Sequence, residues 1–455
     1  MGAVLSAKSS SRRNERNYDN ITHFPPNPSL LQVKTESGGH ETISLKTLIE
    51  SYCPSLFRKF TPLWYLFNGH LQTLYCVFGN FAKDDPMTYS RRYIQMADGG
   101  TIGLDFAPVN QDSLADDTPI VVIQHGLTGG SYEPYVRAIL HRACAPVSEG
   151  GMGYRAVVIN FRGCAGVPVT SPRFYSAGHT DDTRHALAYV SHLYPNAHLH
   201  AVGFSLGSNV LTRYLGEEGE DTRLHSTCAL ACPWNLLHNN RGLLESFLGT
   251  HVYSKGMGGN LLNLLKKHAH ALMDDPSHHV AVAAQKALAL KSPTLELFDE
   301  TFTRIAGGPE PHFPFNNADD YYVWGSSDKM VEHIRVPFLA INADDDPVVR
   351  RVPMDGCGNK NVIMQLTKGG GHLGWFEAGE GRVERWSTKP VLEWLQLMAE
   401  KVVQKHNSRC PKLRIDDEGW LQEEGRPRIR FKELVERRCI VEGNRGADMG
   451  VLQGL

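Results

Sequence analysis

A serine flanked by two glycines has the residue types and spacing of a catalytic nucleophile. The segment Gly203–Gly207 reads Gly-Phe-Ser-Leu-Gly and directly follows the apolar run Leu199–Val202. In a G-x-S-x-G sequence the glycines permit a sharp turn from a strand into a helix, which lifts the serine hydroxyl above a sheet. We therefore predict that Ser205 is a nucleophile. The Leu206 backbone N–H, at the start of the helix, is the predicted donor to a developing oxyanion.

A second loop is expected to supply the other oxyanion donor. His125 and Gly126 follow the apolar run Ile120–Ile123. A His-Gly turn at the end of a strand brings a backbone N–H close to the nucleophile, and we predict that this donor is the Leu127 N–H. His125 itself is expected to orient the loop and not to act as the base.

A histidine in a glycine-rich loop is the predicted general base. After a G-x-S-x-G turn, an acid and then a histidine usually follow along the chain. His372 lies in the loop Gly369–Gly374, after the apolar run Val362–Leu366. We predict that His372 takes the Ser205 proton and returns it to the leaving group.

Three consecutive aspartates are candidates for the acid that orients this histidine. Asp344–Asp346 follow the apolar run Phe338–Ile341. A carboxylate here would fix the tautomer of His372 and stabilise the imidazolium, whereas another of the three could cap a helix. Asp346 is the predicted triad acid, and Asp345 is the alternative.

The elements that must position these loops are strands and helices in alternation. Residues 92–106 read as two strands joined by a tight turn. Short, continuous apolar runs are typical of strands covered on both faces, as in a parallel sheet, and six occur: 120–123, 156–159, 199–202, 227–231, 338–341 and 362–364. Helical patterns lie between most of them, for example at Thr180–Leu193. We therefore predict an α/β fold with a doubly wound, mostly parallel sheet.

Changes in composition along the chain predict its organisation. Residues 1–45 are polar and rich in Pro, Ser and Asn, which predicts a flexible N-terminal arm. Residues 46–232 and 335–405 are predicted to form the core. Residues 233–334 contain helical patches without a buried-strand run, which predicts a helical cap over the C-terminal ends of the strands. Residues 406–455 are predicted to be a charged C-terminal extension.

The first residues carry a lipidation pattern. Met1–Ser6 matches M-G-x-x-x-[ST], so Gly2 is a candidate for N-myristoylation. One acyl chain binds membranes only weakly, but four basic residues follow and would add to the attraction: Lys8, Arg12, Arg13 and Arg16. We expect a cytoplasmic protein that associates peripherally with membranes or lipid droplets through this arm. The alternative is a disordered arm with an unmodified Gly2.

The overall composition argues against several other classes of protein. Lys and Arg total 47 against 49 for Asp and Glu, so no global charge favours nucleic acid as a partner. The nine cysteines are an odd number without paired spacing, which favours reduced thiols. His268, His270, His278 and His279 lack accompanying Cys or carboxylate spacing, so we expect no metal and no cofactor. The oligomeric state stays open.

Five motifs together resemble a known family. The chain is similar, over roughly residues 50–400, to the YheT-like (AB-hydrolase 4) branch of the α/β-hydrolases, and the segments that carry the resemblance are 68–73, 125–127, 160–166, 175–182 and 371–372. The resemblance implies an α/β-hydrolase fold and a charge-relay triad of Ser205, Asp346 and His372. Members include fungal medium-chain fatty-acid ethyl-ester synthase/esterases and animal phospholipid-cleaving proteins.

The expected function is that of a serine carboxylic-ester hydrolase or acyltransferase. It would act on medium-chain acyl esters through an acyl-serine intermediate. Six apolar cap residues are expected either to hold the acyl chain or to form the core of the cap: Leu261, Leu262, Leu264, Leu265, Phe298 and Phe302. Two alternatives remain, a phospholipase or lipid hydrolase at a membrane surface and a non-catalytic lipid-binding member of the fold.

Overall fold

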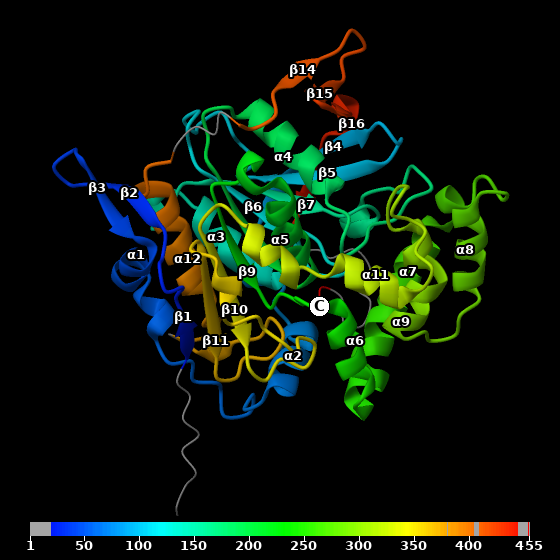
Figure 1. Ribbon diagram of the computed structural model, residues 1–455, viewed down its shortest axis with the longest axis horizontal. Coiled ribbons are helices and arrows are strands. Elements are labelled where there is room, and N and C mark those ends of the chain that lie inside the picture. The colour runs from blue at the N-terminus through cyan, green and yellow to red at the C-terminus, as the bar shows by residue number, and fades with distance from the viewer. Residues whose placement is uncertain (1–19, 380, 405–408, 445–453, 455) are drawn as a thin grey trace, which may run out of the picture.

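A single large sheet runs through the centre of the protein (Figure 1). The computed structural model describes residues 20–379, 381–404, 409–444 and 454. The sheet has 13 strands, in the order β1-β11-β10-β9-β8-β6-β7-β5-β4-β16-β15-β14, and β17 also pairs with β4. Its six central strands are parallel to one another: β6 (Ile120–Gln124), β7 (Arg155–Asn160), β8 (Leu199–Phe204), β9 (Ser226–Leu230), β10 (Phe338–Ala343) and β11 (Val362–Thr367). The predicted mostly parallel sheet is confirmed, because each of the six apolar runs forms one of these strands.

Helices cover both faces of the sheet, which explains why its central strands contain continuous apolar runs. On β6, Val121 and Ile123 belong to one buried apolar layer, while Ile120 and Val122 belong to the other. Three helices contribute to the first layer: α1 (Leu45–Tyr52), α3 (Pro134–Cys144) and α12 (Thr388–Gln396). Two pack on the second, α4 (Asp181–Leu193) and α5 (Leu206–Glu218). The predicted doubly wound architecture follows from this arrangement.

Antiparallel strands extend the sheet at both edges. β4 (Thr88–Met96) and β5 (Thr101–Ala107) form the predicted hairpin, and β5 pairs with β7. Beyond β4 lie four short strands from the charged extension: β14 (Leu413–Ile415), β15 (Leu421–Glu423), β16 (Arg426–Glu433) and β17 (Cys439–Glu442). The extension is therefore part of the sheet.

The prediction of a flexible arm over residues 1–45 is wrong for residues 21–44. β1 (Ile21–His23) pairs antiparallel with β11 at the opposite edge of the sheet, and β2 (Leu30–Lys34) pairs with β3 (His40–Ser44). These strands are short and mostly exposed, so their sequences lack the apolar periodicity that reveals a strand. Gly2 lies outside the described residues.

Helices occupy the long segment between β9 and β10 and lie to one side of the sheet (Figure 1). The main ones are α6 (Leu236–Leu244), α7 (Lys255–Leu272), α8 (His279–Leu288), α9 (Leu295–Phe298) and α11 (Ala318–Gly325). A short π-helix, Asp299–Thr303, directly follows α9. They pack around an apolar cluster that includes Leu206 and Val210 of α5, so this helical layer rests against the carboxyl end of β8. Within the described ranges, none of the helices is both long and apolar enough to cross a lipid bilayer.

Candidate active site

Ser205 occupies a strained turn between β8 and α5. Its backbone has φ 49° and ψ −116°, a conformation that L-residues rarely adopt. Gly203 and Gly207 permit this turn, because a Cβ at Gly203 would lie 2.7 Å from Ser208 Cα and one at Gly207 would lie 2.2 Å from the Gln124 carbonyl oxygen. The glycine spacing therefore reflects close packing of backbone on backbone.

A hydrogen-bonded chain joins Ser205 to His372 and Asp346. His372 Nδ1 lies 2.8 Å from Asp346 Oδ2, and His372 Nε2 lies 2.7 Å from Ser205 Oγ. A proton on Nδ1 donates to the carboxylate, which leaves Nε2 to accept from the serine hydroxyl. The imidazole is fully buried, and Asp346 and Ser205 are each 4% exposed. The structure thus brings together the three residues that the sequence predicts as nucleophile, base and acid.

The three consecutive aspartates have three different partners. Asp346 Oδ1 accepts from the backbone N–H groups of Val348 and Val349, at 2.7 and 2.9 Å, so both of its oxygens are engaged. Asp345 instead accepts from the Gly371 N–H at 2.9 Å, and burial raises its pKa. Asp344 pairs with Lys368. Asp345, the alternative acid, is therefore a support of the histidine loop.

Helix α2 (Gly69–Phe78) holds the loop that carries His372. The His372 backbone N–H donates to Thr73 Oγ1 at 2.8 Å, and the Thr73 hydroxyl donates to the Gly69 carbonyl at 2.7 Å. A Cβ at Gly371 would lie 2.3 Å from that same carbonyl oxygen. Sequence reasoning missed Thr73 as a supporting residue, although the segment 68–73 was among the motifs that carry the family resemblance.

Two tyrosines and Gly454 anchor the loop that carries Leu127. Tyr135 Oη accepts from the Gly126 N–H at 3.1 Å, and Tyr175 Oη accepts from the Thr128 N–H at 3.0 Å. The Gly454 N–H donates to the Leu127 carbonyl at 3.0 Å, and the Tyr135 hydroxyl donates to the Gly454 carbonyl at 2.8 Å. This loop is therefore tied on both sides of Leu127. Tyr175 belongs to the segment 175–182 that carries the family resemblance, but nothing in the sequence indicated that it supports this loop. Tyr135 lies in none of the five motifs.

His125 acts within this loop and lies outside the serine relay. Its Nδ1–H donates to the Gly126 carbonyl at 2.8 Å, and its Nε2 accepts from the Phe161 N–H at 3.3 Å. Burial lowers the pKa of His125 to about 4, so the imidazole is neutral at ordinary pH. This geometry agrees with an orienting residue and not with a base.

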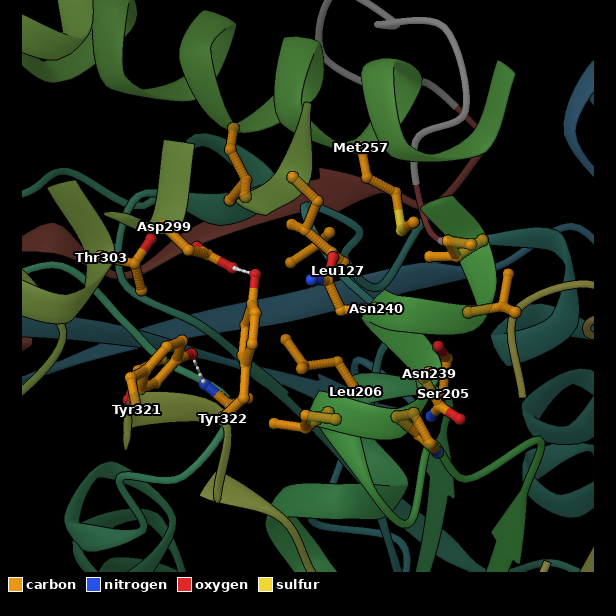
Figure 2. A pocket seen from close by; sticks show the side chains of 18 of the residues that line it. Leu127, Ser205, Leu206, Asn239, Asn240, Met257, Asp299, Thr303, Tyr321 and Tyr322 are labelled. Carbon is orange, nitrogen blue, oxygen red and sulfur yellow. Dashed lines mark hydrogen bonds between the residues drawn. The ribbon is translucent and has the colours of Figure 1, made fainter. Parts of the chain in front are cut away.

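A mostly apolar pocket opens beside Ser205 (Figure 2). Leu127 and Leu206, the predicted oxyanion donors, both line it. Further apolar lining comes from the loops and the helical layer: Pro233, Leu236, Leu243, Met257, Leu261, Leu295 and Val348. Of the six cap residues expected to hold an acyl chain, Leu261 lines the pocket. The other five are buried in the core of the helical layer.

Polar side chains interrupt this apolar lining in two places. Asn239 and Asn240, on α6, line the pocket and are each more than nine-tenths buried. Asp299 and Thr303, on the π-helix, line it together with Tyr322 of α11. Sequence reasoning indicated none of these residues, because single polar residues in a helical segment carry no local signal of a pocket.

Comparison with known proteins agrees with the geometry. A family model described as the alpha/beta hydrolase fold matches residues 119–378. A monoacylglycerol lipase of Saccharomyces cerevisiae is 32% identical over 80% of this chain and 87% of its own length. A medium-chain fatty acid ethyl ester synthase/esterase 2 of the same yeast is 29% identical over 84% and 98%, and a phospholipase ABHD3 of Mus musculus is 29% identical over 78% and 83%. The resemblance indicated by the sequence motifs is confirmed, and the chain belongs to the α/β-hydrolase family.

Proposed function

We propose that the protein is a serine esterase that cleaves medium-chain acyl esters through an acyl-Ser205 intermediate. The observation that carries the proposal is the buried chain from Ser205 Oγ to His372 Nε2 and from His372 Nδ1 to Asp346, at the wall of an apolar pocket. A serine hydroxyl is a weak nucleophile until an oriented base removes its proton. No such arrangement is needed for a protein that only binds lipid.

In the first half-reaction, Ser205 Oγ attacks the ester carbonyl carbon while its proton passes to His372 Nε2. Asp346 stabilises the resulting imidazolium. The carbonyl oxygen becomes an oxyanion, for which the Leu127 and Leu206 backbone N–H groups are the proposed donors. The bond to the leaving alcohol then breaks, and His372 gives the proton to the departing oxygen.

In the second half-reaction, an acceptor hydroxyl attacks the acyl-Ser205 carbonyl. His372 takes the acceptor's proton and returns it to Ser205 as the acyl–oxygen bond breaks. Water as acceptor yields a carboxylic acid, and an alcohol yields a new ester. Esterase and acyltransferase activities therefore share every protein group and differ only in the acceptor.

The pocket and the relatives support lipid-like esters as substrates. The pocket is concave and mostly apolar, as small-molecule sites usually are, and leucines are the most frequent residues in its lining. Proteins named for monoacylglycerol, for medium-chain ethyl esters and for phospholipid are all similar over most of this chain. We therefore place these three lipid classes first in a substrate panel, tested with water or ethanol as acceptor.

Labelling by a fluorophosphonate probe tests the nucleophile. Wild-type protein should label stoichiometrically and Ser205→Ala should not, whereas Ser37→Ala, at an exposed turn, should label like wild type. Equal labelling of Ser205→Ala would overturn the proposal. A folded wild-type protein that does not label would overturn it as well.

We further propose that membrane association depends on Gly2. The support is the myristoylation pattern of Met1–Ser6 and the basic residues that follow it. Gly2→Ala should shift the protein from the membrane fraction to the supernatant after expression in a eukaryotic cell. Equal partitioning of the two forms would contradict the proposal.

A further inference from the structure

The end of the pocket remote from Ser205 is built from hydrogen-bonding groups. In Figure 2, Ser205 lies at one side of the pocket, while Asp299, Thr303, Tyr321 and Tyr322 gather at the opposite side, with leucines between them. All four polar residues line the pocket and belong to the helical layer between β9 and β10. The pocket therefore has a reactive end and a second polar end.

The carboxyl of Asp299 is the centre of this second end. It is 4% exposed, and its Oδ2 accepts from the Tyr322 hydroxyl at 2.8 Å. Burial raises the pKa of Asp299 to about 7, although the hydroxyls of Thr303 and Tyr322 act to lower it. No cation contributes to its surroundings within the part of the chain that the structure describes. Asp299 is thus a buried carboxyl without an ion pair.

Tyr321 adds a second hydroxyl at this end of the pocket. Its hydroxyl oxygen accepts from the Ala177 N–H at 2.9 Å, so the hydroxyl proton remains to be donated elsewhere. Tyr321 and Tyr322 are adjacent on α11, and each is 3% exposed. A ligand group that reached this end would meet both a hydrogen-bond donor and an acceptor.

The buried carboxyl of Asp299 lowers the stability of the fold, and binding of a polar ligand group would give it a role. Taking a carboxyl out of water into an apolar pocket costs free energy, even when neighbouring hydroxyl groups donate to it. A leucine at position 299 would continue the apolar lining formed by Leu261 and Leu295 and would better suit an unsubstituted acyl chain. The polar end therefore indicates a ligand that is apolar near the ester and polar at a distance from it.

Resting on the proposed esterase function, we propose that Asp299, Tyr321 and Tyr322 form a subsite for a hydroxyl group on the acyl chain, remote from the ester carbonyl. The preferred substrates would then be esters of hydroxylated fatty acids. The acyl part is placed in the pocket because it stays attached to Ser205 between the two half-reactions, whereas the alcohol must leave. The hydroxyl would donate to Asp299 and accept from the Tyr321 O–H.

Hydrogen bonding to the ligand hydroxyl would let this subsite select hydroxylated acyl chains over unsubstituted ones. A site built to hydrogen-bond a hydroxyl rejects the analogue that lacks it, because the buried protein groups then lose the hydrogen bonds to the ligand. The reverse discrimination, by an apolar pocket against an added hydroxyl, is much weaker. We therefore expect kcat/KM to be at least about tenfold higher for the hydroxylated substrate than for its unsubstituted analogue.

Paired substrates test the subsite directly. The probes are p-nitrophenyl esters of saturated fatty acids and of the same acids with a terminal hydroxyl, over a series of chain lengths. Wild type should prefer the hydroxylated member at the chain length that spans the pocket. Asp299→Leu should reverse the preference, and Tyr322→Phe should reduce it. Asp274→Leu, which replaces an exposed carboxylate of the same helical layer, should keep the wild-type ratio.

The outcomes separate this subsite from the esterase function. If wild type hydrolyses both members equally at every chain length, or if Asp299→Leu folds and keeps the wild-type ratio, the subsite is overturned while the esterase function stands. Asp299→Asn, which retains a hydrogen-bonding amide, should keep part of the preference and serves if the leucine variant does not fold. Hydrolysis by Ser205→Ala at the wild-type rate would overturn the esterase function itself.

Discussion

Ser205 is held in position by its backbone as much as by its hydrogen bonds. A φ of 49° at a non-glycine residue costs on the order of 1–3 kcal/mol, which the surrounding packing must offset. The close contacts at Gly203 and Gly207 leave little room for the turn to relax. The hydroxyl is therefore presented to His372 in a fixed direction before any substrate binds.

The acid of the relay can be tested against its own neighbour. Asp346→Asn should lower kcat by about 10⁴-fold with little change in KM, because an amide cannot hold His372 in the tautomer that accepts the serine proton. Asp345→Asn is the matched control, since it changes the adjacent carboxylate, which contacts the Gly371 N–H. Kinetics on a soluble p-nitrophenyl ester would measure both. Similar losses in the two variants would contradict the proposed role of Asp346.

Asp299 should make the stability of the fold depend on pH. Its pKa in the folded protein is about 7 against an ordinary value of 3.8, so between these values the folded state binds more protons than the unfolded state. The contribution of Asp299 to the free energy of unfolding therefore falls as the pH rises from about 4 to about 7, and it stays constant above that range. Asp299→Asn removes this loss. The difference in free energy of unfolding between Asp299→Asn and wild type should be more favourable to the variant at pH 8 than at pH 5, by on the order of 2 kcal/mol.

Thermal or urea unfolding at the two pH values would measure this difference in stability. Asp274→Asn is the control, because Asp274 is exposed and should contribute no such difference. An Asp299→Asn effect that is equal at pH 5 and pH 8 would contradict a raised pKa at this site.

The sequence was informative about residues whose roles follow from local context. Ser205, His372 and Asp346 each lie in the turn or loop that follows an apolar strand run, and the structure brings them together. Thr73 could not be predicted in the same way, because its partner His372 lies 299 positions away along the chain. The place of Asp299 in the pocket could not be predicted either, because it depends on how the helical layer packs.

At the scale of elements, α2 acts as the support of the histidine loop. Thr73→Val keeps the shape of the side chain but leaves the buried His372 N–H without its acceptor, which costs about 1–3 kcal/mol. We expect kcat to fall by about tenfold to a hundredfold, because a small shift of the base misaligns it with Ser205.

Thr73→Ser is the matched control for this prediction, because it retains the hydroxyl and should retain most of the activity. Rates should be compared at saturating substrate, together with melting temperatures of all three proteins. A Thr73→Val variant with wild-type kcat would show that the loop keeps its position without this bond.

Elements were predictable where both faces of a strand are buried. The central strands are continuous apolar runs, since two helical layers cover them, and the sequence predicted each one. β14–β17 are exposed or half-buried at most positions and carry charged residues, so their sequences resemble loops. Their pairing depends on β4, which is more than 300 residues earlier in the chain. No local pattern could reveal it.

At the scale of the whole molecule, the extension contributes to the core through Phe431. This side chain is fully buried and packs edge-to-face on His185 and Tyr189 of α4, at ring-centroid distances of 5.7 and 6.2 Å. Phe431→Ala should lower the free energy of unfolding by about 3–5 kcal/mol. Ile415→Ala is the control, because Ile415 is 62% exposed on β14 and should change stability by less than about 0.5 kcal/mol.

Chemical denaturation of the two variants would measure these changes. Folded Phe431→Ala should still be labelled at the active site. Phe431 and α2, the helix that supports the histidine loop, pack on opposite faces of the sheet. Equal stability of Phe431→Ala and wild type would mean that the extension packs only loosely on the body.

The position of β16 and β17 has a consequence for how the chain folds during synthesis. Until they are made, β4 has an unpaired edge that can join another chain, and β4 is synthesised more than 300 residues earlier. During synthesis, the β4 edge of the sheet is therefore unpaired until β16 and β17 have been made. A nascent chain of this protein should for that reason depend on chaperones that shield exposed strands until its last strands have emerged.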